Sequence, residues 1–115
     1  MIRTSEKYRD SIRDNREVFM NGERVKDVTA HPMSKPLVDI RARMYDMAHD
    51  PATRDVMTVA QGADVNAIGS ALPYTQEDWW AKRRATDLLM EDIGGVVTRV
   101  GDETVGEMWS LFDGT

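Results

Sequence analysis

The sequence contains no cysteine. This absence excludes disulfide bridges, thiolate nucleophiles, zinc ribbons and iron–sulfur clusters held by cysteine ligands of this chain. Long hydrophobic runs are also missing, whereas a transmembrane helix needs about 20 apolar residues. Residues 1–10 alternate in charge and lack the apolar segment of a signal peptide. We therefore expect a cytoplasmic protein with no membrane-spanning segment.

A basic surplus is lacking as well. Lysine and arginine together number 15 against 20 acidic residues, so the formal net charge is -5. Nucleic-acid binders normally present a basic face, and this balance argues against that class. What is present is an ordinary globular composition, 41% hydrophobic, in 115 residues. The length predicts one small domain, residues 1–115, with eight methionines and three tryptophans as an unusual excess.

Capping residues, prolines and apolar periodicity predict a mainly helical chain. The expected helices run from Thr4 to about Asp14-Asn15, from Pro36 to about Met47, and from Thr75 to Gly94-Gly95, with a short turn capped by Asp50. Thr75 and Asp78 resemble a capping box at the start of the longest helix.

Turn signals predict one or two short β-hairpins between these helices. Asn21-Gly22 follows Val18–Met20 and precedes Val25, and Asn-Gly favours a tight turn because both positions tolerate positive φ. A second hairpin is expected around Gln61-Gly62, with Met57–Val59 and Val65–Ile68 as its strands.

The histidines and carboxylates do not form a recognisable metal motif such as H-E-x-x-H. His31 and His49 each precede a proline or an Asp-Pro pair, which favours local hydrogen bonds at helix starts. The carboxylates Asp46, Asp50 and Asp55 are explained by helix capping and solvated faces. We therefore predict no metal site.

The basic run Lys82-Arg83-Arg84 is interpreted as a solvated helix face, with a phosphate or cofactor contact as the alternative. Trp79 and Trp80 are adjacent and point about 100° apart on a helix. We expect one of them to pack internally and the other to reach an interface, where tryptophan is enriched.

The last part of the sequence carries two further features. Arg99 lies between glycines, which by itself indicates a salt-bridged turn or a close approach of another group. An apolar cluster then follows close to the end, formed by Val105, Met108, Trp109, Leu111 and Phe112. Such a cluster is typical of an interface, so we expect either part of a longer protein or a small subunit that docks on another chain.

Four stretches together resemble the N-terminal region of the 4-hydroxyphenylacetate 3-hydroxylase family, the oxygenase component of two-component flavin monooxygenases. They are MIRTSEKYRDSIRD at the start, REVFMNGERVKDVTAHP at 16–32, MYDMAHDPATRDVMT at 44–58 and TQEDWWAKR at 75–83. The combination of G-E-x-V-x-D-V-T-x-H-P with Y-D-x-x-H-D-P carries the resemblance, which extends over most of the chain.

The resemblance implies a helical N-terminal domain of a larger flavoenzyme with an acyl-CoA-dehydrogenase-like fold. The middle β-barrel and the C-terminal helical bundle of the family are absent from this chain, and the family's main catalytic histidine lies beyond Thr115. The implied activity is insertion of one oxygen atom from O2 into a phenolic or related aromatic substrate. The implied cofactor is reduced FAD supplied by a separate reductase. The implied partners are the rest of the oxygenase or a larger subunit, within a homo- or hetero-oligomer.

One family site falls inside the sequence. The family pattern G-x-x-G-R-S-P-D plus an aromatic residue faces flavin and substrate, and Gly95, Arg99 and Asp102 match it. Glu103 replaces the aromatic residue, and Val100-Gly101 replaces Ser-Pro. The resemblance implies that Arg99, Asp102 and Glu103 bind substrate or flavin, with no catalytic residue in this chain.

Two alternatives remain within this resemblance. The 4-hydroxybutyryl-CoA dehydratase branch of the family holds an iron–sulfur cluster through cysteines in this region, and the absence of cysteine disfavours it. The departures at Glu103 and Val100-Gly101 favour a non-catalytic assembly or regulatory subunit that keeps the N-terminal fold.

Overall fold

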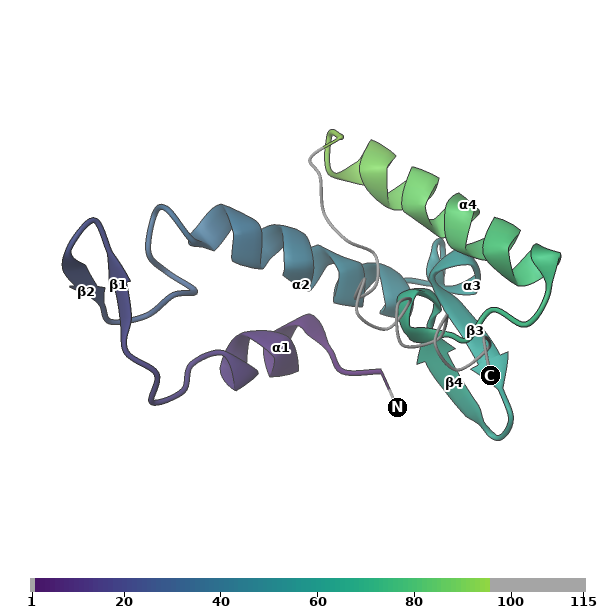
Figure 1. Cartoon of the computed structure of the whole chain (residues 1–115), viewed down its shortest axis with the longest axis horizontal. Helices are drawn as coiled ribbons and strands as arrows, with labels where there is room; N and C mark the ends of the chain where they lie inside the picture. Colours follow the sequence, from purple (N-terminus) through teal and green to yellow (C-terminus); the bar gives the residue numbers. More distant parts are fainter. Residues whose placement is uncertain (1, 96–115) are drawn as a thin grey trace, which may run out of the picture. The chain divides into compact units, whose positions relative to one another are not determined.

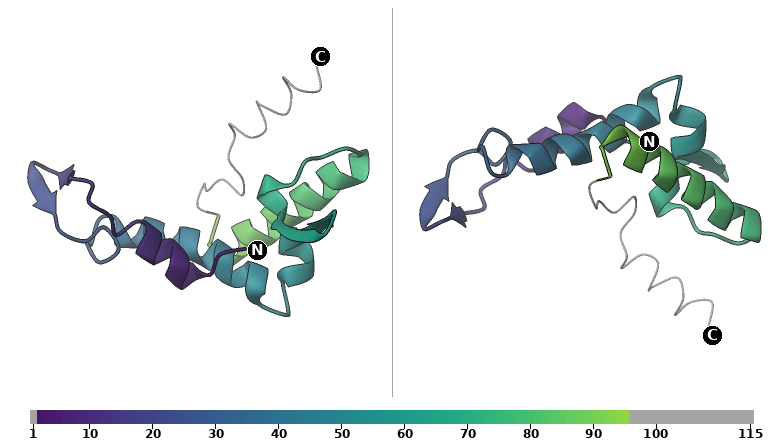
Figure 2. Two further views of the ribbon diagram at one scale, coloured as in Figure 1. Left: turned by 90° about the horizontal axis from the view of Figure 1, so that it is seen from below. Right: turned by 90° about the horizontal axis from the view of Figure 1, so that it is seen from above.

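Helices and two short antiparallel hairpins make up the computed structural model, which describes residues 2–95 (Figure 1). This confirms the predicted mainly helical fold. The described chain divides into two units, Arg3–Asp46 and a second unit that contains Ile2 and the residues from Met47 onward. Figure 2 shows the same elements from two further directions.

The N-terminal unit begins with helix α1, Ser5–Ser11. Thr4 caps it as predicted, because its hydroxyl accepts a hydrogen bond from the Lys7 amide at 3.2 Å. The predicted end near Asp14-Asn15 is wrong, since α1 ends at Ser11. The Asp14 carboxylate instead accepts the Arg16 amide at 3.0 Å. This local hydrogen bond competes with helical pairing and turns the chain toward the first strand.

The predicted Asn-Gly hairpin is confirmed. Strands β1, Val18–Met20, and β2, Glu23–Val25, pair antiparallel with Val18 opposite Val25. Asn21 has φ 50° and Gly22 has φ 80°, the left-handed pair of angles that a two-residue hairpin turn requires.

Helix α2, Lys35–His49, confirms the helix predicted from Pro36 onward, and its residues up to Asp46 belong to the N-terminal unit. Two contacts join it to α1. The Arg9 guanidinium pairs with the Asp39 carboxylate at 2.8 Å, and the Tyr8 and Tyr45 rings stack with centroids 5.2 Å apart. Val38 and Ala42 are buried on α2.

The second unit contains a short helix, a hairpin, a 3-10 turn and the longest helix. In chain order these are α3, Arg54–Met57; β3, Thr58–Gln61; β4, Asp64–Ala67; η1, Ile68–Ser70; and α4, Gln76–Asp92. The second hairpin is thus confirmed, but β3 and β4 begin and end at other residues than the predicted strands Met57–Val59 and Val65–Ile68. Met57 closes α3 and Ile68 opens η1, because both side chains are buried in the core of this unit.

Local sequence also sets the ends of α4. The predicted capping box is present, with the Thr75 hydroxyl accepting from the Asp78 amide and the Asp78 carboxylate accepting from the Thr75 amide. The helix ends before Gly94 and Gly95, because their φ values of 74° and 77° are incompatible with a right-handed helix.

Candidate functional site

The residues predicted to bind substrate or flavin, Arg99, Asp102 and Glu103, lie outside the described residues. The predicted apolar cluster at 105–112 lies outside them as well. Both therefore stay predictions. The described chain carries a pocket, a basic run and two adjacent tryptophans, and each bears on what this region can do.

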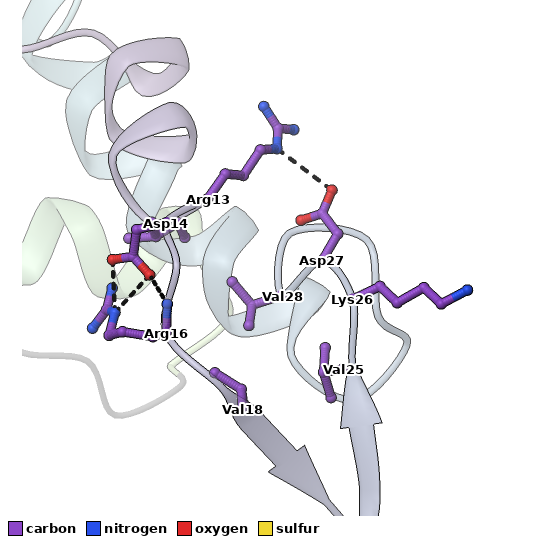
Figure 3. Close-up of a pocket in the computed structure, with 9 residues that line it drawn as sticks. Arg13, Asp14, Arg16, Val18, Val25, Lys26, Asp27 and Val28 are labelled. Atoms are coloured by element: carbon purple, nitrogen blue, oxygen red, sulfur yellow. Dashed lines mark hydrogen bonds and ion pairs between the residues drawn. The ribbon is translucent and has the colours of Figure 1, made fainter.

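A pocket of about 240 Å³ lies in the N-terminal unit between the end of α1 and the first hairpin (Figure 3). Its lining combines apolar side chains from the two strands and their flanks with charged side chains. The lining residues are Ile12, Arg13, Asp14, Arg16, Val18, Val25, Lys26, Asp27 and Val28.

The charged groups of this pocket are largely occupied with one another. Arg13 donates to the Thr29 hydroxyl at 3.0 Å and lies 3.5 Å from the Asp27 carboxylate. Arg16 pairs with Asp14 at 2.7 Å, and the hydrogen bonds from its side chain and amide lower the pKa of the Asp14 carboxyl. The Thr29 hydroxyl and amide likewise lower the pKa of Asp27. Acidic partners thus neutralise both guanidinium groups.

This pocket does not fit FAD. Its volume lies below the roughly 300–1,000 Å³ of sites for drug-sized ligands and cofactors. A diphosphate would also have to displace carboxylates from both arginines, and Lys26 extends away from them in Figure 3. No step of flavin chemistry is assigned to the residues of this pocket.

His31 and Asp50 make local hydrogen bonds of the predicted kind. The His31 ring nitrogen Nδ1 accepts the Met33 amide at 3.2 Å just before α2, which is the predicted local hydrogen bond. Asp50 accepts the Ala52 amide at 2.9 Å in the following turn. Among residues 2–95, no three histidine or acidic side chains converge as metal ligands. Within the same range, no helix is long and apolar enough to cross a membrane.

The basic run divides into two kinds of residue. Arg83 pairs with Asp87 at 2.9 Å and Arg84 with Glu77 at 2.7 Å, on an exposed face of α4 as predicted. The prediction of a solvated side chain is wrong for Lys82. Its ammonium donates to the Ile68 and Gly69 carbonyls at 2.8 and 3.1 Å, and burial lowers its pKa. Lys82 therefore holds η1 against α4, a contact between segments that the linear sequence does not reveal.

The prediction that one of the two adjacent tryptophans packs internally is wrong in the described chain. Trp79 and Trp80 are each 56% exposed. The face of α4 that packs inside its unit is instead formed by Ala85 and Leu89, both at 0% exposure. The apolar pattern of the sequence does not single out Ala85, because a small residue adds little to such a pattern, yet its side chain is fully buried.

Comparison with known proteins identifies the region. The family model described as "4-hydroxyphenylacetate 3-hydroxylase N terminal" matches residues 4–115. The chain is 50% identical over 88 residues to the (3S)-3-amino-3-(3-chloro-4-hydroxyphenyl)propanoyl-[peptidyl-carrier protein SgcC2] monooxygenase of Streptomyces globisporus, covering 76% of this chain and 15% of that protein. It is 46% identical over 87 residues to the oxygenase component of 4-nitrophenol 2-monooxygenase of Rhodococcus sp, covering 76% of this chain and 16% of that protein.

Solved structures show the same fold. The oxygenase component of 4-hydroxyphenylacetate 3-monooxygenase, HpaB, in complex with FAD matches with a TM-score of 0.71 and 28% identity, over 78% of this chain and 19% of that chain. A 4-hydroxybutyryl-CoA dehydratase from N. maritimus matches with a TM-score of 0.72 over 80% of this chain and 19% of that chain. Its 22% identity shows the fold alone.

The chain spans only about one sixth of the length of the two curated relatives described above. The family model nevertheless matches nearly the whole of this chain, from residue 4 to residue 115. By sequence and by fold, this chain belongs to the 4-hydroxyphenylacetate 3-hydroxylase family, of which it represents the N-terminal region.

Proposed function

We propose that this chain is the N-terminal part, or a small subunit, of a reduced-flavin-dependent aromatic hydroxylase. Such an assembly inserts one oxygen atom from O2 into a phenolic or related aromatic substrate. The match of residues 4–115 to the family model carries the proposal. The relatives support it, since they are named as monooxygenases of phenols and several are oxygenase components.

The bound reduced flavin supplies the oxygen chemistry, and the contribution of this chain is to bind and orient. The Arg99 guanidinium suits a carboxylate, a phenolate or a flavin edge, because it can donate two parallel hydrogen bonds to an anion. Asp102 fixes the turn that follows Arg99, and Glu103 faces the bound molecule. FAD is supported by its presence in the matched HpaB structure.

The remaining parts of the proposal concern the assembly. Residues 1–115 act as one helical domain, and this chain alone is inactive. A β-barrel and a helical bundle complete the oxygenase, on the same or another chain, and a separate reductase provides FADH2. The two-component names of the relatives support the reductase. We place the resulting oligomer in the cytoplasm.

The test is reconstitution of the chain with the rest of an oxygenase and a flavin reductase, followed by Arg99→Ala. A hydrogen bond to a charged group contributes about 1.5–3 kcal/mol, so hydroxylated product should fall roughly tenfold to a hundredfold. Arg54→Ala is the matched control, because Arg54 is exposed and its ion pair with Asp55 is 3.8 Å long. A reconstituted wild-type assembly without NADH and O2 consumption coupled to product would contradict the proposal.

A second candidate function is a non-catalytic assembly or regulatory subunit. Glu103 in the place of the family's aromatic residue and Val100-Gly101 in the place of Ser-Pro favour it. The same Arg99→Ala variant separates the two functions. Unchanged turnover with weakened assembly would favour the regulatory subunit.

A further inference from the structure

The surface at the start of α4 exposes three large aromatic side chains within seven residues. Tyr74 is 69% exposed, and Trp79 and Trp80 are 56% exposed each. All three lie in the second unit. We call them the aromatic surface. At about 150–250 Å² for each side chain, they present roughly 400 Å² of aromatic area. An exposed apolar patch of that size on a small protein commonly marks an interaction site.

Helix geometry turns this surface away from the core of its own unit. Trp80 lies nine positions before the fully buried Leu89, which places it about 180° around the helix from that residue. Trp79 lies ten positions before Leu89, about 80° away on the flank. The packing of α4 inside its unit therefore leaves both tryptophans more than half exposed, at 56% each.

The charged side chains of α4 beside the tryptophans are paired. Arg83 binds Asp87 and Arg84 binds Glu77, in both cases along the helix itself. A partner that covers the aromatic surface therefore leaves no isolated charge behind, which would carry a large desolvation penalty. Aromatic residues at the centre with arginines at the rim are the composition of a protein–protein interface.

We propose that the aromatic surface is the docking site for the part of the oxygenase that lies beyond this N-terminal region. This inference rests on the proposed function. The occupant follows from the comparison of lengths, because the chain represents only 15–16% of its two relatives. More than four fifths of those oxygenases is thus polypeptide outside this region, and an exposed aromatic patch of roughly 400 Å² is typical of a surface that another segment covers.

A chimera tests the proposal. In the Rhodococcus sp oxygenase component, the 87-residue matched segment is replaced by the corresponding part of this chain. Hydrogen exchange and acrylamide quenching then compare residues 74–84 in the chimera and in the isolated 115-residue chain. We expect at least a tenfold slower exchange and weaker tryptophan quenching in the chimera. Equal exchange and quenching in the two proteins would overturn the proposal.

Surface variants refine this test. Trp79→Ser and Trp80→Ser should lower the melting temperature of the chimera by several degrees and leave that of the isolated chain unchanged. Val65→Ser is the control, because Val65 is 52% exposed in the same unit and lies outside the aromatic surface. Tryptophan variants that destabilise both proteins equally would overturn the proposal. Protection of the isolated chain that rises with its concentration would assign the surface to a second copy and would also overturn it.

One further experiment covers the case in which the melting temperature cannot be measured. If the chimera does not unfold cooperatively, the separately purified downstream polypeptide of the Rhodococcus sp protein is titrated into the isolated chain. Binding that Trp80→Ser weakens at least tenfold supports docking, and the absence of binding overturns it. None of these readouts needs turnover. A protected but inactive chimera refutes the proposed function alone, whereas an active chimera with an exposed aromatic surface refutes the docking site alone.

Discussion

Lys82 allows the sharpest test of how the second unit is held together. Its ammonium donates to the Ile68 and Gly69 carbonyls at 2.8 and 3.1 Å, which joins α4 to η1. Lys82→Met keeps most of the apolar stem but removes both hydrogen bonds. The Ile68 carbonyl keeps the Ala71 amide as a second donor at 3.3 Å, so the loss falls on the two bonds that Lys82 itself makes.

The magnitude follows from two opposing effects. Hydrogen bonds to a charged donor contribute about 1.5–3 kcal/mol each, which sets an upper limit of roughly 3–6 kcal/mol. Burial lowers the pKa of Lys82, because the partly desolvated ammonium loses hydration, and this loss opposes the gain from the hydrogen bonds. Because much of the side chain still meets water, we expect Lys82→Met to reduce the free energy of unfolding by about 1–2 kcal/mol.

Urea unfolding followed by circular dichroism measures this loss, with hydrogen exchange in α4 to locate it. Arg83→Met is the matched control, because it breaks an exposed ion pair along the same helix and should cost about 0.3–0.5 kcal/mol. If Lys82→Met costs no more than this control, the two hydrogen bonds do not stabilise the unit and the reasoning is refuted.

The pH dependence supplies an independent check on Lys82. Its folded-state pKa is lowered from 10.5, so the unfolded chain binds more protons between the two pKa values. The stability that Lys82 contributes therefore rises as pH increases through that window. Lys82→Met should remove this rise, whereas an unchanged alkaline profile would show that the ammonium is not desolvated.

Two further predictions concern α4. Leu89→Ala should reduce the free energy of unfolding by about 2–5 kcal/mol, because Leu89 is fully buried and its removal leaves a cavity; a urea midpoint close to that of the wild type would contradict the packing described here. Asp78 accepts the Thr75 and Tyr74 amides, which lower its pKa below 3.8. The stability that the Asp78 carboxylate contributes to the folded chain is thus fully present above pH 3.8 and is lost as pH falls through the lowered pKa. Asp78→Asn should therefore flatten the acid limb of the plot of unfolding free energy against pH. An unaltered acid limb would exclude this role.

Much of the local structure was predictable from the sequence because short-range chemistry decides it. Thr4 and Thr75 cap their helices through hydroxyls three residues from the amides they bind. Asn21-Gly22 adopts the two positive φ angles that the turn needs, and Gly94 ends α4 for the same conformational reason. The family was likewise readable from motifs, and the comparisons confirm it.

Tertiary structure decided the features that depend on which segments meet. Lys82 belongs to a basic run in the sequence, but it becomes a structural donor because η1 brings two carbonyls to it. Trp79 and Trp80 have the hydrophobicity of core residues, yet Ala85 and Leu89 form the buried face of α4 and both tryptophans stay exposed. The periodicity of a sequence shows which side chains are apolar. Which of them become buried depends on their size and on the direction in which they point toward neighbouring segments, and that direction is fixed only in the folded unit.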